Sequence, residues 1–216
     1  MDQKEFYSQL VIVPYILIGL CLFIGMVRFN KLSNTQRLLF WLILATVITE
    51  TVSEVLWRKE MNNFPVFHFY AIIEFSLIFT IYYRALYPSF SNKFLYWTLG
   101  GFLGFAIFNA LFLQSLFTAN SNVTTLSSVI LVVLSLLYFY KTLKDSKLIH
   151  LEKSIMFWVS TGVLIYFSSS LVLFTFGNLL VSESISDTMS IWVVHVCFNI
   201  FYYSLLSIAL WMRSAN

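Results

Sequence analysis

Seven apolar runs are the feature of this sequence that most constrains its fold. They cover about residues 10–27, 38–57, 65–83, 94–114, 124–140, 155–176 and 189–211. A helix needs roughly 17–25 apolar residues to cross the hydrocarbon core of a bilayer, which is about the length of each run. Asn62, Asn63 and Pro65 separate the second run from the third, which favours seven helices over six. The sequence therefore predicts an all-α bundle of seven transmembrane helices, with residues 1–216 forming one domain.

The composition agrees with lipid as the main solvent. Hydrophobic residues make up 59% of the 216 residues and charged residues 11%, whereas a soluble domain carries about 25% charged residues. Cys21 and Cys197 each lie within an apolar run, so they predict neither a disulfide framework nor a paired-cysteine metal site. The net charge of +3 is too small to indicate nucleic-acid binding. The bilayer is thus the predicted main partner.

The basic residues predict how the bundle is oriented. If the N-terminus lies outside, the inner loops and the C-terminal tail contain ten of the thirteen Lys and Arg residues. These ten are Arg28, Lys31, Arg37, Arg84, Lys93, Lys141, Lys144, Lys147, Lys153 and Arg213. The outer side keeps Lys4, Arg58 and Lys59. The positive-inside rule therefore predicts an outer N-terminus and a cytoplasmic C-terminus.

Ionisable residues inside the apolar runs indicate where a functional site would lie. Glu50 and Glu54 are four residues apart, which puts both on one face of the second helix. In the third helix, His68 lies near the outer end and Glu74 roughly 9 Å deeper. His195 falls in the outer half of the seventh helix. Ionisable groups in a bilayer normally face the bundle interior or a wet cavity, so we expect these residues to converge in the outer half of the bundle.

Three polar residues complete the predicted pocket. Tyr166 and Ser169 share a stripe of the sixth helix, and Asn199 lies one turn from His195 on the seventh. A plainer interpretation is that such residues only form hydrogen bonds between helices, worth about 0.6 kcal/mol each. The predicted ligand- or proton-binding set is Glu50, Glu54, His68, Glu74, Tyr166, Ser169, His195 and Asn199.

Three functions are compatible with this pocket. In the first, it binds a small ligand or a proton, and helix packing changes as in a sensor. In the second, the chain is a small-molecule or proton-coupled transporter, although its three prolines lie near helix ends and do not break the helices. In the third, Glu50, Glu74 and His195 hold a metal such as zinc or iron in a membrane enzyme. No His-Glu-x-x-His or Glu-x-x-His motif accompanies that metal set.

Familiar catalytic motifs are missing from the sequence. It has no Gly-x-Ser-x-Gly elbow, no Gly-rich phosphate loop and no dinucleotide motif, so it leans against an enzyme and names no cofactor. A microbial rhodopsin needs a lysine in the last helix for retinal, and SIWVVHVCFNIFYYSLLSIALW contains none. Seven-helix hydrolases with His-x-x-x-His on the last helix fit poorly, because position 199 is Asn199.

Three segments resemble parts of short seven-helix bacterial membrane proteins: NNFPVFHFYAIIEFSLIFTIYYRAL, FWVSTGVLIYFSSSLVLF and IWVVHVCFNIFYYSLLSIALW. Similar bundles occur as membrane modules of sensor histidine kinases or as neighbours to them. The resemblance implies a signalling sensor module in the cytoplasmic (inner) membrane. Because only five residues follow Trp211, we expect its output to pass through a separate cytoplasmic protein or through self-assembly.

Overall fold

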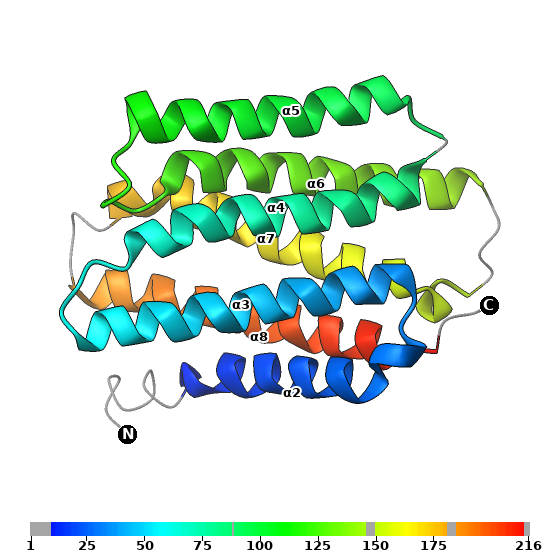
Figure 1. Cartoon of the computed structure of the whole chain (residues 1–216), viewed down its shortest axis with the longest axis horizontal. Coiled ribbons are helices and arrows are strands. Elements are labelled where there is room, and N and C mark those ends of the chain that lie inside the picture. The colour runs from blue at the N-terminus through cyan, green and yellow to red at the C-terminus, as the bar shows by residue number, and fades with distance from the viewer. Residues whose placement is uncertain (1–9, 88, 146–149, 181–184, 214–216) are drawn as a thin grey trace.

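The computed structural model describes residues 10–87, 89–145, 150–180 and 185–213, with backbone only for 174–180 and 185–192. Over this part of the chain the fold is all-helical (Figure 1). The long helices are α2 (Ile12–Arg28), α3 (Asn34–Arg58), α4 (Phe64–Leu86), α5 (Asn92–Phe108), α6 (Ser121–Lys144), α7 (Ile155–Leu180) and α8 (Ile185–Trp211). Seven helices in the described residues are long and apolar enough to cross a membrane, as predicted.

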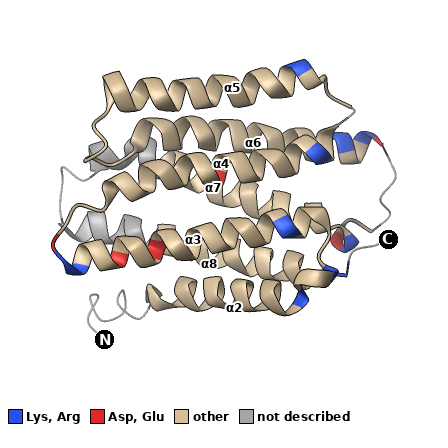
Figure 2. Ribbon diagram, viewed as in Figure 1, with Lys and Arg blue, Asp and Glu red and all other residues tan. Residues whose placement is uncertain are grey.

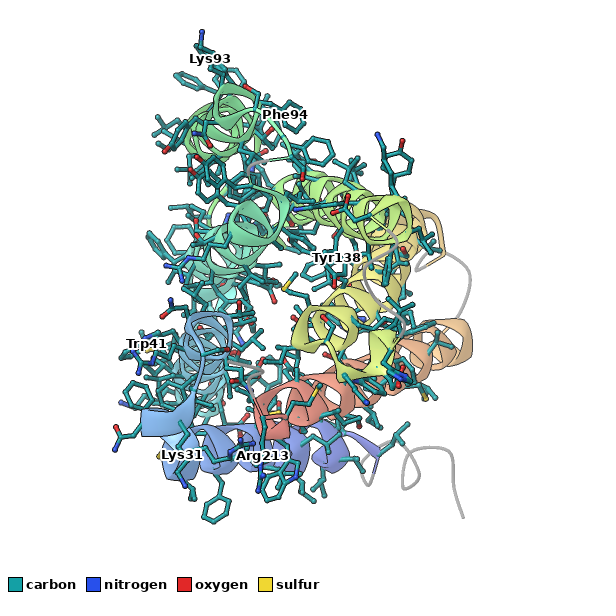
Figure 3. All side chains as sticks on the ribbon, turned by 90° about the vertical axis from the view of Figure 1, so that its right-hand side faces the viewer. Lys31, Trp41, Lys93, Phe94, Tyr138 and Arg213 are labelled. Atoms are coloured by element: carbon teal, nitrogen blue, oxygen red, sulfur yellow. The ribbon has the colours of Figure 1, made fainter. Side chains whose placement is uncertain are left out.

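Six of the described helices form a closed ring. Extensive contacts join α2 to α3, α3 to α4, α4 to α6, α6 to α7, α7 to α8, and α8 back to α2. The remaining long helix, α5, packs from outside against α4 and α6, as the end-on view in Figure 3 shows. In that view Tyr138 of α6 points into the ring, whereas Trp41 and Phe94 point away from it. The first and last of these helices are therefore neighbours.

Helix ends depart from the prediction in places that have a local cause. Helix α3 begins at Asn34 rather than near residue 38 because Ser33 and Gln36 form a capping box. The Ser33 Oγ accepts from the Gln36 backbone N–H at 3.3 Å, and the Gln36 Oε1 accepts from the Ser33 N–H at 3.0 Å. The last two predicted runs are too short where they face each other, because α7 continues to Leu180, beyond 176, and α8 begins at Ile185, before 189. A longer helix satisfies more backbone groups at the membrane boundary.

The C-terminal end of α8 is held by polar side chains from two other helices. Gln36 is fully buried, and its Nε2 donates to the carbonyl oxygens of Leu210 at 3.3 Å and Met212 at 2.9 Å. Arg28 donates to the same two carbonyls, each at 3.1 Å, and lies 5.5 Å from the Trp211 ring centroid. The last carbonyls of a helix have no donors within the helix. Helices α2 and α3 therefore cap α8.

Positive charge gathers at one end of the bundle, here called the basic end (Figure 2). The described basic residues that belong to it by helix position are Arg28, Lys31, Arg37, Arg84, Lys93, Lys141, Lys144, Lys153 and Arg213. At the opposite end the described part of the chain carries Arg58 and Lys59, while Lys4 and Lys147 lie outside it. The charge separation predicted along the sequence is thus present in space.

Two glycines of α2 provide a test of the α2–α3 packing. A Cβ on Gly25 would collide with the Phe40 ring of α3, whereas a Cβ on Gly19 would meet no atom within 4 Å. We expect Gly25→Val to cost about 1–3 kcal/mol by overpacking, and Gly19→Val to act only through helix propensity. Thermal unfolding of both purified variants in the same detergent measures the difference. Equal melting temperatures would contradict this account of the contact.

Candidate functional site

A carboxyl group, a phenol and a hydroxyl form a hydrogen-bonded unit between α3 and α4. The Tyr70 hydroxyl donates to the Glu74 Oε1 at 3.1 Å and lies 2.8 Å from the Thr46 Oγ1. Tyr70 and Glu74 are four residues apart on α4, so they project from one face of that helix. Thr46 comes from the neighbouring α3. The unit therefore joins the two helices through polar side chains.

Glu74 projects toward the inside of the ring from the middle of α4. Ile78 and Ile81, on the same face of α4, keep 1% and 0% of their accessible surface. Glu74 lies between them in helical phase yet is only half-buried. The surface that water can reach on Glu74 thus faces inward. Burying a carboxyl group at this depth of a membrane costs free energy unless polar groups surround it.

Tyrosines on α7 and α8 provide those surroundings from across the ring. The rings of Tyr166 and Tyr202 stack, with centroids 4.7 Å apart and planes at 14°. Tyr202 and its neighbour Tyr203 lie with centroids 5.3 Å apart at 56°. All three phenols are close enough to the Glu74 carboxyl to interact with it electrostatically. Glu74 therefore stands between the α3–α4 pair and the α7–α8 pair.

A second carboxyl group borders the same space. Glu50 of α3 is half-buried and accepts a hydrogen bond of 3.4 Å from the Tyr15 hydroxyl of α2. It also interacts electrostatically with the phenols of Tyr166 and Tyr203. We name the whole group the tyrosine–carboxylate cluster. Its members are Thr46, Glu50, Tyr70, Glu74, Tyr166, Tyr202 and Tyr203.

Three predicted pocket residues lie beside the cluster with local contacts of their own. The His195 ring is half-buried, with its centroid 5.9 Å from that of Tyr166. Asn199 donates from Nδ2 to the backbone carbonyl of His195 at 3.1 Å. The Ser169 hydroxyl donates to the backbone carbonyl of Tyr166 at 2.7 Å. The side chains of Asn199 and Ser169 therefore form these hydrogen bonds within their own helices.

Two predicted pocket residues have their hydrogen-bond partners outside the cluster. Glu54 is exposed and forms an ion pair of 2.8 Å with Arg58 one turn further along α3. Exposed pairs of this spacing contribute only about 0.3–0.5 kcal/mol. His68 is buried, but its Nε2 lies 3.0 Å from the carbonyl oxygen of Thr118, in the connection between α5 and α6. Glu50 and Glu74 therefore share tyrosine neighbours, while Glu54 is paired with Arg58 but still interacts electrostatically with Glu50, and His68 bonds elsewhere.

The metal alternative requires three ligands around one point. Within the part of the chain that the structure describes, no three His, Cys, Asp or Glu side chains gather in this way. Glu50, Glu74 and His195 all lie in that part, so the fold does not bring them into one coordination sphere. The tyrosines instead dominate the surroundings of Glu74, and phenols suit hydrogen bonding to organic groups.

Tyr70 and Tyr202 are cluster members that the predicted set lacks. Tyr70 precedes Glu74 by four residues, and this spacing places a phenol beside a carboxyl group on any helix. Tyr202 sits in the Tyr202–Tyr203 pair of the last apolar run. Adjacent helical residues point about 100° apart, so the pair alone does not predict that both rings turn inward, as they do here.

A second polar network closes the end of α5. The helix ends in a π-helical turn, η2 (Asn109–Leu113), and π turns are frequent at functional sites. Asn109 is fully buried and accepts a hydrogen bond of 2.9 Å from the Nδ2 of Asn122. Asn122 lies in the first turn of α6. It is also the asparagine to which a glycan would be attached in the sequon Asn122-Val123-Thr124. This hydrogen bond occupies the amide that a glycan would modify.

Comparisons of the chain with protein-family models, with curated proteins and with solved structures find no match. The resemblance to modules associated with histidine kinases therefore stays a prediction. The interpretation of the cluster rests on its own geometry: two carboxyl groups and four phenols on four helices of one ring.

Proposed function

We propose that this chain is a receptor-like sensor module that binds a small ligand at the tyrosine–carboxylate cluster. The observation that carries the proposal is the position of Glu74. Its carboxyl accepts a hydrogen bond from Tyr70 and interacts with Tyr166 and Tyr202 from the opposite side of the ring. An ionisable residue inside a membrane bundle is costly and marks a functional site by default.

Helix α8 is the element that would carry the signal. It contributes Tyr202 and Tyr203 to the cluster, and its last carbonyls are held by Arg28 and Gln36 at the basic end. Because a helix is stiff, a ligand that moves the two tyrosines also strains or releases this cap. A local change in packing with a distant readout is how ligand switches work. The signal would be a change in the surface that the basic end presents to a partner.

The basic end is the side on which we place the signalling partner. The excess of Lys and Arg there supports a cytoplasmic location under the positive-inside rule, with the N-terminus outside. The resemblance to bacterial sensor modules supports the cytoplasmic membrane as the site of action. A separate cytoplasmic protein, or a second copy of the chain, would then receive the signal.

A thermal-shift screen in lipid nanodiscs tests the proposed site. We expect a compound from a panel of water-soluble metabolites to raise the melting temperature of the wild type and of Glu54→Gln, but not of Glu74→Gln. A ligand at about 100 times its Kd stabilises a protein by about 2.7 kcal/mol, which shifts the melting temperature by several degrees. Glu54→Gln is the matched control, because it makes the same chemical change at an exposed glutamate that pairs with Arg58.

The same compound separates a sensor from a transporter. A sensor binds it without net uptake into proteoliposomes that contain the wild type. Uptake that Glu74→Gln abolishes would assign a transporter instead. Equal stabilisation of the wild type and Glu74→Gln would contradict a binding site at the cluster.

A further inference from the structure

We propose that the ligand is a small protonated amine, whose ammonium group binds between the Glu74 carboxyl and the stacked Tyr166–Tyr202 pair. This inference rests on the proposed binding function and specifies its ligand class. It follows from three properties of the cluster: its charge, the arrangement of its aromatic rings and one hydroxyl group. The charge and the rings favour a positive group, and the hydroxyl favours a group that can donate hydrogen bonds.

The charge of the cluster favours a cation. Neither Glu50 nor Glu74 forms an ion pair among the described residues. The described Lys and Arg residues lie toward the two ends of the bundle, away from the middle of the ring (Figure 2). Carboxyl groups buried in a membrane protein normally pair with a group of opposite charge. A ligand ammonium would supply that charge, whereas a carboxylate or phosphate ligand would meet two acidic groups.

Three phenol rings from α7 and α8 lie near the Glu74 carboxyl. Tyr166 and Tyr202 are nearly parallel at 14°, and Tyr203 is inclined to Tyr202 by 56°. A cation is attracted to the face of a tyrosine ring when it lies within about 6 Å of the ring centroid. Because Tyr166 and Tyr202 stack on each other, their facing surfaces are covered, so a cation beside Glu74 would lie against one outer ring face or beside the phenol oxygens. A cation held here contacts a phenol and Glu74 together.

The hydroxyl of Tyr202 gives an independent indication of a ligand. Tyr202 keeps only 2% of its accessible surface, and its Oη has no hydrogen-bond partner among the residues that the structure describes. The same phenol interacts electrostatically with Glu74. Buried hydroxyls are nearly always hydrogen-bonded. An ammonium N–H that donates to both Tyr202 and Glu74 would satisfy this oxygen, which a quaternary ammonium group could not do.

Matched probes test the ligand class in purified protein in nanodiscs. The first series is propylammonium, 1-propanol and propionate, and the second is benzylammonium, benzyl alcohol, benzoate and benzyltrimethylammonium. We expect the better of the two primary amines to bind at least tenfold more tightly than its matched alcohol and carboxylate. The quaternary ion should bind more weakly than benzylammonium, because it cannot donate to Tyr202. Equal affinity for amine and alcohol, or no binding of either amine, would overturn the proposal.

Variants connect the amine to its two partners. Glu74→Gln should weaken amine binding at least tenfold, and Glu74→Asp should keep the preference for the amine over the alcohol. Tyr202→Phe should weaken the amine several-fold without lowering the melting temperature, because the removed hydroxyl has no partner among the described residues. Glu54→Gln should change nothing. Amine binding that is insensitive to both Glu74→Gln and Tyr202→Phe would overturn the proposal.

The design separates this inference from the function on which it rests. A neutral or acidic compound whose stabilising effect depends on Glu74 would keep the binding site and reject the amine. An amine that binds and is also taken up into proteoliposomes would keep the ligand class and reject the sensor. Gel filtration of each variant shows that it is folded before its affinity is compared.

Discussion

Replacing Gln36 by leucine is expected to lower the melting temperature of the purified protein by about 4–12 °C. Arg28 also donates to the Leu210 and Met212 carbonyls that Gln36 contacts. The Ala209 carbonyl, however, accepts from Gln36 at 2.8 Å and the Ser33 N–H donates to Gln36, so loss of Gln36 removes the partner of these two groups. Each such group costs about 1–3 kcal/mol, and a total near 2–3 kcal/mol corresponds to this shift for a chain of about 200 residues. Thermal unfolding in one detergent measures it.

Two further variants assign the effect to one side of Gln36. Gln36→Glu keeps an acceptor for Ser33, and therefore the capping box, but loses the donor to α8. We expect it to be as unstable as Gln36→Leu. Asn34→Leu is the control, since Asn34 is exposed in the same turn and makes the same change from polar to apolar. A stable Gln36→Glu would show that the capping box, and not the cap on α8, matters.

Gly162→Leu is expected to have the second large effect, on both stability and ligand binding. A Cβ on Gly162 of α7 would lie 3.2 Å from Cδ2 of Tyr202 and 3.5 Å from Cβ of Leu205, both on α8. A leucine must therefore push α8 away and displace the Tyr202 ring. Overpacking of this kind costs about 1–3 kcal/mol. Loss of the tyrosine pair should also weaken binding of the amine probe more than tenfold.

Gly104→Leu is the matched control for Gly162→Leu. A Cβ on Gly104 of α5 would meet no atom within 4 Å, so a leucine there extends into open space. Both changes place the same side chain on a membrane-spanning helix. Gly104→Leu should keep the wild-type melting temperature and affinity within error. Gly162→Leu protein that melts and binds like the wild type would contradict the close approach of α7 and α8.

The number of helices and their charge distribution could be predicted from the sequence, whereas their arrangement could not. Hydropathy reports length and lack of charge, and these suffice to count spans. Lipid is as apolar as the interior of a membrane bundle, so hydrophobic periodicity does not reveal which face of a helix meets protein. The exclusion of α5 from the ring therefore has no clear sequence signal. Even the small residues of α5 do not mark a packed face, because a Cβ on Gly100, Gly101 or Gly104 would meet no atom within 4 Å.

The site could be predicted in part for the same reason. Helical phase and depth placed Glu50 and Glu74 in one predicted pocket, because ionisable groups avoid lipid, and in the fold the two share Tyr166 and Tyr203 as neighbours. The same criteria did not separate Glu54, whose partner Arg58 stands at the favourable spacing of four residues and could have been recognised. The position of His68 depends on Thr118, fifty residues away in a loop whose path the sequence does not specify.

The closure of the ring by α2 and α8 has a consequence for biogenesis. Helices enter the membrane in chain order, so Glu50 and Glu74 arrive long before the α7 and α8 tyrosines that face them. At that stage their available partners are Tyr15 and Tyr70, which donate to them from helices already made. Neither hydrogen bond requires α7 or α8, so both can form before those helices are inserted. Insertion of α8, which contacts both α7 and α2, then closes the ring around the two carboxyl groups.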